Sequence, residues 1–581
     1  MATEELVTEQ FQFLGIDVDN DVLTKCVLLC EEYGVDAETF VEQWMAFSLS
    51  HLNGAAPTLK NLDLLERKEF SKRGVDQVNA AIKETSHQNA GKSLTIYSVP
   101  VDDQPETDVL SNYMTTTTPK RVKVEKDTSN HSELRPATYS PTVGHSAKYA
   151  SRTNAGTVVF SYGDEDVKPV DINNVLNLNV TQVPNDDNDT YSKAMFGFEL
   201  LYEKATVYDN HIRYISQTIL KKLGITETCS VRHKSQTEVT VAGRIECDAD
   251  ARLNPKSVVL QGTWDESLSQ AVPVDLDNVQ QYALFPGQVA VLRGVNPRGD
   301  RFQAREVLCD AALPLADHRK DLTNTFIGSM SMIVVAGPYT TSDNLSYEPL
   351  KDLVTYIGMH KPHIVIMTGP FMDSEHVKVK DNTLAETYKS FFEKLLDSLG
   401  EISNTSPQTK ICIVSNQSDA FHVNIYPTPP YTTRKKHPNI QFLPDPCTLN
   451  INGIYVGVTS TDVLMQISKE EISLGTGGDK LARLAGHVIG QQSFSPLWPP
   501  PGAPVDAALW AAHAQLPRTP HVLILPSNFR YFVKEVSGCV VVNPERLAKG
   551  AVGGTFARLT LNLTDKTEHV CKSISAQIIR I

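Results

Sequence analysis

The stretch SMIVVAGP at residues 331–338 and the stretch HIVIMTGP at residues 363–370 decide the fold of the C-terminal half of this chain. Each is a near-continuous apolar run that ends in Gly-Pro and is followed by a helical pattern. Apolar runs without alternation indicate strands buried on both faces, as in a parallel sheet covered by helices. Three further runs of this kind occupy residues 410–415, 453–458 and 521–526. Residues 316–581 are therefore predicted to form a layered α/β domain.

The carboxyl ends of these strands are where the chemistry of such a domain must be sought, because ligands bind there in open α/β sheets. A two-metal phosphoesterase needs carboxylates and imidazoles at this edge, converging on metal ions about 3.5 to 4 Å apart. The first strand ends instead in Ala336-Gly337-Pro338, the second in Gly369-Pro370-Phe371, and the third in Ser415-Asn416-Gln417. We therefore predict no catalytic residue, no metal ligand and no cofactor at these strand ends.

The histidines of this region stand at other places. His363 and His521 begin their strands, and His487 lies in a helical pattern with Ile489 where a G-H-x-H motif needs its second histidine. Structural or surface roles are the favoured interpretation of these three side chains. The alternative is an irregular site, whose candidate residues are Asp343, Asp373, Asp419 and His422.

A second pattern precedes the α/β domain, within residues 166–315. Short apolar runs alternate with turn residues from Thr237 to Val307, and this spacing, with glycines where a barrel bends, predicts an OB-fold β-barrel. Many OB-folds bind single strands by stacking bases on aromatic side chains over a basic groove. Because these strands carry few aromatic residues and little positive charge, a protein-binding barrel is favoured and a single-strand DNA-binding barrel is the alternative. The pattern leaves open whether residues 167–202 belong to the barrel or to the α/β domain.

The first part of the chain, residues 1–75, has apolar residues at helical spacing, punctuated by glycines. This pattern predicts a small α-helical bundle that acts as an independent protein-interaction domain, with a helical cap packed on the rest of the chain as the alternative. Asp36 suits the start of a helix. Cys26 and Cys30 lie four residues apart on an apolar helix pattern, and we interpret them as core residues.

Residues 76–165 are predicted to be a disordered, flexible linker, because Ser, Thr, Asn, Lys and Pro dominate and too little apolar surface is available to offset conformational entropy. Thr118 and Ser140 both precede a proline and are candidate phosphorylation sites, and the residues after Thr118 match the pattern that cyclin-dependent kinases read. Lys120, Arg121 and Lys123 form a candidate nuclear-import basic cluster.

The composition of the 581 residues restricts the function classes further. A formal net charge of −14 disfavours strong nonspecific DNA binding by the chain alone, because such binding needs clustered Lys and Arg. Nine scattered cysteines without a C-x-x-C pair disfavour a disulfide framework or a zinc ribbon. An acidic N-terminus and the lack of a long apolar run make a secreted or membrane location an unfavourable interpretation.

Longer and more specific runs carry a resemblance. They are LFPGQV at 284–289, AGPYTTSD at 336–343, TSTDVL at 459–464, LPSNFRYF at 525–532 and KGAVGGTFARL at 549–559. Through these runs the chain resembles the B-subunit family of the DNA polymerase alpha–primase complex, over roughly residues 192–581.

The resemblance implies an OB domain joined to an inactive calcineurin-like phosphoesterase domain, in a nuclear subunit that is not an enzyme. Together these domains would bind the C-terminal domain of the catalytic subunit and meet the small and large primase subunits through the complex. The assembly would make primers at the initiation of DNA replication and on the lagging strand, while the N-terminal helices recruit other replication proteins. Little direct DNA binding by this chain alone is expected. The alternatives are a metal-dependent phosphodiesterase or nuclease and a single-strand DNA-binding OB protein.

Overall fold

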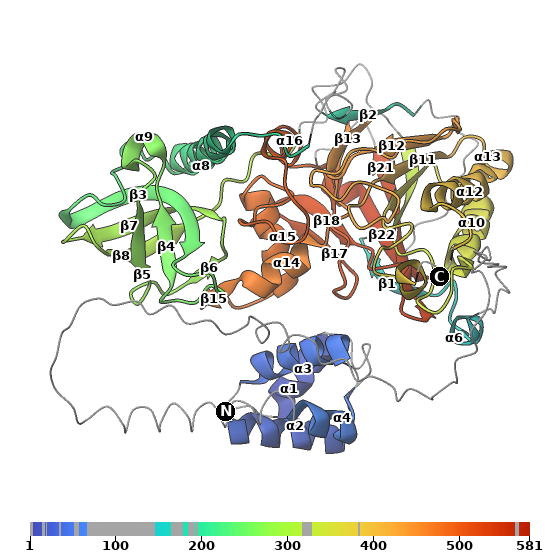
Figure 1. Ribbon diagram of the computed structural model, residues 1–581, viewed down its shortest axis with the longest axis horizontal. Coiled ribbons are helices and arrows are strands. Elements are labelled where there is room, and N and C mark those ends of the chain that lie inside the picture. Colours follow the sequence, from blue (N-terminus) through green and yellow to red (C-terminus); the bar gives the residue numbers. More distant parts are fainter. Residues whose placement is uncertain are drawn as a thin grey trace, which may run out of the picture. The chain divides into compact units, whose positions relative to one another are not determined.

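The computed structural model describes residues 4–13, 18, 20–33, 36–51, 57–66, 146–163, 178–183, 191, 196–316, 328–381, 384–563 and 569–581 (Figure 1). The chain divides into two compact units, Met1–Ala137 and Thr138–Ile581. The candidate phosphorylation sites and the basic cluster lie outside the described residues, as does the predicted linker up to residue 145.

The described part of the first unit consists of helices, as the sequence predicts. They are α1 (Glu4–Phe13), α2 (Asn20–Tyr33), α3 (Ala37–His51) and α4 (Leu59–Leu65). Asp36 directly precedes α3, and its carbonyl accepts the first helical hydrogen bond from the amide of Phe40 at 2.9 Å. Cys26, Cys30 and Trp44 are buried in the shared core of the four helices. The two cysteines are therefore core residues.

The second unit contains the predicted barrel. Its strands are β3 (Ser235–Cys247), β4 (Val258–Gln261), β5 (Ala271–Asp275), β7 (Val289–Asn296) and β8 (Phe302–Leu308). They close in the order β3-β4-β5-β8-β7, and alternate side chains along them, such as Leu260, Val272 and Leu292, fill the interior. Two short elements, α9 (Trp264–Ser267) and β6 (Tyr282–Leu284), interrupt the connections between the strands.

The α/β domain has two sheets rather than one. The first runs in the order β1-β22-β21-β9-β10-β11-β12, and the second in the order β17-β18-β16-β14-β13-β2. The strands of the first sheet are β1 (Val158–Tyr162), β9 (Gly328–Ala336), β10 (Ile364–Thr368), β11 (Lys410–Val414), β12 (Ile440–Leu443), β21 (Thr555–Leu563) and β22 (Ile574–Arg580). Those of the second are β2 (Val180–Val183), β13 (Cys447–Ile451), β14 (Ile454–Val458), β16 (Val522–Ile524), β17 (Phe532–Val536) and β18 (Cys539–Asn543).

The two sheets pack face to face and carry helices on their outer faces, which confirms a layered α/β domain. Side chains of both sheets, including Val334 of β9 and Val456 of β14, share one buried core. Helices α10 (Glu348–His360), α12 (Tyr388–Gly400) and α13 (Ile402–Thr405) cover the first sheet, and α14 (Val463–Glu470) and α15 (Lys480–Gly490) cover the second. The short elements are α6 (Ala147–Ala150), α11 (Val377–Lys380), α16 (Ala507–His513), β15 (Ile472–Leu474), β19 (Ala548–Lys549), β20 (Val552–Gly553) and η3 (Val570–Ser573).

The start of the second unit differs from the predicted boundaries. Residues 146–163, placed by the sequence in the 76–165 linker, are folded: β1 pairs antiparallel with β22 near the end of the chain. Strand β2 lies in residues 167–202, whose domain the sequence left open; it pairs with β13 and so belongs to the α/β domain. Both strands are too short for a clear pattern, and their partners lie more than 200 residues away, so local sequence could not reveal them.

Helix α8 (Leu201–Leu223) joins the barrel to the α/β domain. It lies along β3 and β7 on one side and contacts α16 on the other, as Figure 1 shows. Tyr208 of α8 packs between Trp498 and Trp510 of the α/β domain, with ring centroids at 3.8 and 5.4 Å. The guanidinium of Arg244 on β3 lies 5.5 Å from the Trp498 ring. The helix therefore touches both domains at one aromatic cluster.

A buried glutamine makes the second connection. Gln491, directly after α15, is 1% exposed. Its Oε1 accepts from the amide of Val289 on β7 at 2.7 Å, and its Nε2 donates to the carbonyls of Val289 at 3.1 Å and Cys309 at 2.8 Å. Next to it, Gln492 Nε2 donates to the carbonyl of Ala311. Strand β15 of the α/β domain also pairs with β6 of the barrel segment. These contacts hold the two domains in one arrangement.

Glycine 287 is required at this junction. Gly287 has φ +97°, and a Cβ there would lie 2.2 Å from the amide nitrogen of Trp498 and 2.6 Å from the carbonyl oxygen of Pro496. The same amide of Trp498 donates to the carbonyl of Pro286 at 3.0 Å. Because the atoms that a Cβ would meet belong to the backbone, they cannot move aside to accommodate a larger residue.

We predict that Gly287→Ala lowers the free energy of unfolding by about 3 kcal/mol and loosens the barrel from the α/β domain, because it adds both a clash and a strained φ. Thermal unfolding and limited proteolysis of the full chain measure both effects. Gly477→Ala is the matched control, since nothing lies within 4 Å of a Cβ at Gly477. Equal melting temperatures for the two variants would contradict this role of Gly287.

Candidate functional site

The carboxyl ends of β9, β10 and β11 lie side by side, in the place where a sheet of this kind holds its chemistry. Gly337 and Gly369 follow the first two strands and allow a very close approach of the loops. A Cβ on Gly337 would lie 2.1 Å from the carbonyl oxygen of Pro370, and one on Gly369 would lie 2.6 Å from Asn416 Cβ. The loops therefore close on one another and leave little space directly above the strands.

Asp419 is the carboxylate at the centre of these loops, and both of its oxygens accept hydrogen bonds. Its Oδ1 accepts from the amides of Phe371 at 2.7 Å and Met372 at 2.6 Å. Its Oδ2 accepts from the hydroxyl of Tyr431. Burial raises the pKa of Asp419 to about 7, against the effect of these three hydrogen bonds. This carboxylate orders the loop after β10 and is buried away from solvent.

Aromatic side chains close the same region. The hydroxyl of Tyr339 donates to the carbonyl of Thr368 at 2.9 Å, and that of Tyr347 donates to the carbonyl of Phe371 at 2.8 Å. The rings of Tyr339 and Phe371 stack with centroids 4.5 Å apart. Burial raises the pKa values of Tyr339, Tyr347 and Tyr431 well above their usual range. The Tyr339 and Tyr347 hydroxyls donate to backbone carbonyls, and the Tyr431 hydroxyl donates to the Asp419 carboxylate.

The other residues of the predicted irregular site each have hydrogen-bond partners of their own, although the backbone of Asp373 pairs with that of Asp419. Asp343 is hydrogen-bonded by Thr341 and Ser146; burial alone would raise its pKa, but these bonds lower it. Asp373 accepts from the amide of Glu375 at 2.9 Å. His422 Nε2 donates to the carbonyl of Pro429 at 2.7 Å, and burial lowers its pKa. Within the residues that the structure describes, no group of three or more His, Cys, Asp or Glu side chains could hold a metal ion.

The three histidines of the sequence analysis have structural partners. His363 Nδ1 accepts from the amide of Ser331 at 3.1 Å, and His521 Nδ1 accepts from the amide of Tyr455 at 3.0 Å. His487 Nε2 lies 2.8 Å from Glu471, a buried carboxylate that also binds Arg483. Burial alone would raise the pKa of Glu471, but its bonds to His487 and Arg483 hold it at about 2. His363 and His521 thus lie at the starts of their strands and His487 lies in α15, all away from the strand-end loops.

One cavity of about 250 Å³ opens beside the strand ends. Its walls include the aromatic residues Tyr347 and Phe371 and the polar residues Asp373, Glu375 and His376. His376 Nε2 donates to the carbonyl of Thr341 at 3.0 Å, and Lys380 pairs with Glu375 at 2.5 Å. The imidazole and one carboxylate of the cavity therefore already have partners.

A second candidate site is the exposed apolar segment before and at the start of α8. Phe198 is 76% exposed and Leu201 is 87% exposed, with Leu200 and Tyr202 also exposed. Glu199 anchors the segment, because its carboxylate accepts from the amide of Ala508 in α16 at 2.7 Å. Large apolar side chains held on ordered backbone are typical of a protein-binding surface. The sequence run FELLY carried this signal, but only the structure shows that no other described element covers it.

These features define a class of protein: a multidomain chain with an OB barrel joined to an α/β domain whose strand-end loops are closed by hydrogen bonds. Family models agree with this division. The model for the B subunit of DNA polymerases alpha and epsilon matches residues 332–534. The models for the OB domain and the N-terminal domain of the DNA polymerase alpha B subunit match residues 205–310 and 4–72. The class is therefore the accessory B subunits of DNA polymerases.

Within this class, the chain belongs to the family of DNA polymerase alpha B subunits. It is 33% identical to the DNA polymerase alpha B subunit of Rattus norvegicus and 33% identical to that of Mus musculus, in each case over the full length of both chains. It is 31% identical to the DNA polymerase alpha B subunit of Drosophila melanogaster, again over all of both chains. A role as a B subunit in DNA replication follows. Among the helices that the structure describes, none has the length and apolar character needed to cross a membrane.

We predict that Asp419→Ala lowers the free energy of unfolding by about 3 kcal/mol, because two buried amides and the Tyr431 hydroxyl lose their acceptor. Asp419→Asn keeps one acceptor oxygen at similar volume and should lose less. Denaturant unfolding and the metal content of the purified chains check this together. A purely structural role for this carboxylate would be contradicted if Asp419→Ala unfolded at the same denaturant concentration as the wild type. It would also be contradicted if the wild-type chain held one metal ion and Asp419→Asn held none.

Proposed function

We propose that this chain is a non-catalytic scaffold subunit of a DNA polymerase alpha–primase assembly, acting in the nucleus. Its barrel and α/β domain hold the C-terminal domain of the catalytic subunit. The small and large primase subunits are part of the same assembly, which makes primers at the initiation of replication and on the lagging strand. The N-terminal helices recruit other replication proteins.

The single observation that carries this proposal is the anchored apolar segment at the start of α8, beside the joint between the two domains. Leu201, 87% exposed, and Phe198 project from backbone that Glu199 fixes to α16. A constitutive interface is expected to be larger and more apolar than a transient one. A partner seated here would contact both domains, whose arrangement Gln491 and α8 keep constant. We therefore assign this segment to the interface with the catalytic subunit.

The α/β domain acts in this proposal as an inactive phosphoesterase-like layer. Pro338 and Pro370 stand where carboxylates or imidazoles would be needed, and without such ligands neither Lewis-acid activation nor a bound hydroxide is available. Asp419 accepts hydrogen bonds from two loop amides. These observations support a subunit without hydrolytic activity over the alternative of a metal-dependent phosphodiesterase or nuclease.

Coexpression of residues 138–581 with the C-terminal domain of the polymerase alpha catalytic subunit should give a complex that survives high salt, because apolar contacts are not screened by ions. Residues 1–75 should not bind that domain. Leu201→Asp together with Phe198→Asp should weaken the complex at least about 30-fold, the effect of losing a hot spot of about 2 kcal/mol. Isothermal titration calorimetry of the purified fragments measures these affinities.

The matched control is Met359→Asp, which places the same charge at a residue of α10 that is 68% exposed. It should bind as the wild type does. If residues 138–581 stayed monomeric in this mixture while residues 1–75 carried all the binding, the assignment of the scaffold to the second unit would be wrong.

The predicted linker supplies a regulatory test. We propose that Thr118 and Ser140 are phosphorylated in the cell cycle, and that phosphate at Thr118 adds about −1.5 to −2 charges beside Lys120, Arg121 and Lys123 and weakens contacts made by these cations. Phosphopeptide mapping of synchronised cells should find phosphate at Thr118. Ser495 also precedes a proline but is buried in the α/β domain, so it should stay unmodified. Thr118 unmodified at every stage would rule this regulation out.

A further inference from the structure

Two segments that lie about 60 residues apart in the sequence meet at one end of the barrel. Asn296, the last residue of β7, pairs with Ser235 at the start of β3. Its Nδ2 donates to the carbonyl of Val231 at 3.2 Å, and its Oδ1 accepts from the amide of Gly299 at 2.8 Å. A Cβ on Gly299 would lie 2.9 Å from Lys234 Cγ. The turn between β7 and β8 therefore lies against residues 231–234.

This contact gathers positive charge. Arg232 and Lys234 come from the first segment, and Arg298 and Arg301 come from the turn; all four are exposed, and we call them the turn cations. Arg232 Nε donates to a backbone carbonyl of β5 at 3.0 Å, which leaves its charge uncompensated. Among the described residues, no salt bridge joins any of the four to a carboxylate. Asp300 is the only acidic residue in either segment, so the two segments together carry an excess of positive charge.

Other cations of the same barrel differ in this respect. Arg293 on β7 pairs with Glu306 at 2.8 Å, and Arg305 on β8 lies 3.6 Å from Glu238. The strand cations are thus compensated, whereas the turn cations are available to neutralise an external anion. The overall charge of −14 does not cancel such a patch, because charges further away than the Debye length, about 8 Å at physiological salt, are largely screened.

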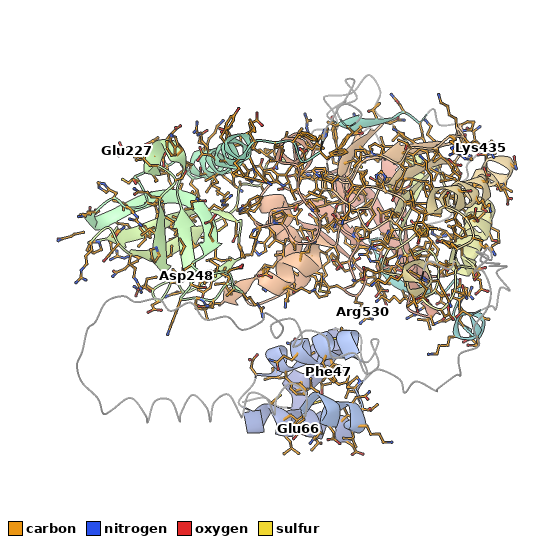
Figure 2. The ribbon with its side chains drawn as sticks, in the orientation of Figure 1. Phe47, Glu66, Glu227, Asp248, Lys435 and Arg530 are labelled. Carbon is orange, nitrogen blue, oxygen red and sulfur yellow. The ribbon has the colours of Figure 1, made fainter. Side chains whose placement is uncertain are left out.

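An aromatic side chain lies at the same end of the barrel. Ser267 Oγ of α9 accepts from the amide of Val231 at 3.1 Å, which places α9 beside the first of the two segments. Trp264 at the start of α9 is 61% exposed. In Figure 2, Glu227 is labelled beside α9. Asp248, the residue after β3, is labelled at the opposite end of the barrel. Uncompensated guanidinium groups near an exposed indole suit a ligand with phosphates and planar bases.

We propose that the turn cations bind the phosphate backbone of a single-stranded nucleic acid, with Trp264 available to stack on a base. The turn joins the fourth and fifth barrel strands, a position where OB-folds contact oligonucleotides. This chain would therefore bind a single-stranded nucleic acid weakly and in a salt-dependent way. It adds to, and does not depend on, the proposed contact with the catalytic subunit at the start of α8.

Fluorescence anisotropy of a labelled oligothymidylate of about 20 nucleotides, titrated with the full chain between about 50 and 200 mM salt, tests the proposal. The quadruple variant Arg232→Gln, Lys234→Gln, Arg298→Gln and Arg301→Gln removes the turn cations. Each lost phosphate contact should reduce the slope of log K against log salt by about 0.7, so the slope should fall by about 3. Because all four side chains are exposed, the melting temperature should stay unchanged.

The control carries Arg293→Gln and Arg305→Gln, which remove two compensated cations from the same barrel. Its slope should change by less than about 0.7, the value for one phosphate. The proposal is overturned if the wild-type chain shows no salt-dependent binding, or if the quadruple variant keeps the wild-type slope. It is equally overturned if the slope of the control falls as much as that of the quadruple variant. The same holds if polyglutamate of the same charge displaces the labelled oligonucleotide as well as unlabelled oligonucleotide does.

Discussion

The buried amide of Gln491 is the constraint on which the arrangement of the second unit depends. It makes both hydrogen bonds that a neighbouring strand would offer to Val289, and it satisfies the carbonyl of Cys309 as well. A buried amide that lost these partners would cost about 1 to 3 kcal/mol for each unsatisfied group. The barrel therefore cannot rotate on the α/β domain without breaking several buried bonds at once. The aromatic cluster around Tyr208 and the close approach at Gly287 lie at the same joint.

The strand-end loops are held together by their own polar groups. Gly337 and Gly369 allow the tight crossing of two loops. Their buried polar groups bind one another: Asp419 accepts from two amides and the Tyr431 hydroxyl, and the Tyr339 and Tyr347 hydroxyls donate to carbonyls. Buried polar groups must find partners within the protein when no ligand supplies them. The loops therefore form an internally bonded surface of the domain.

Much of this architecture could be predicted from the sequence. The apolar runs at residues 331–338 and 363–370 gave buried parallel strands, and helical spacing gave the N-terminal helices, because both signals are local. The division into two sheets, β1 and β2 could not be predicted, since their pairings join distant parts of the chain. The sequence places Pro338 and Pro370 at the strand ends, but it could not reveal the partners of Asp419. The turn cations could not be predicted, because each pair alone is an ordinary polar turn and the two pairs meet only in the folded chain.

The pairing of β1 with β22 has a practical consequence. A sheet whose outermost strand leaves its N–H and C=O groups bare invites another molecule to add a strand there. Strand β1 occupies that position on the first sheet, and β2 does the same for β13 on the second. A truncated chain that began at residue 166 would lack β1, and one that began at residue 192 would lack both. Such fragments would expose the longer strands β22 or β13 as sheet edges that another copy could pair with, even though every residue of the barrel and of the proposed catalytic-subunit interface is present.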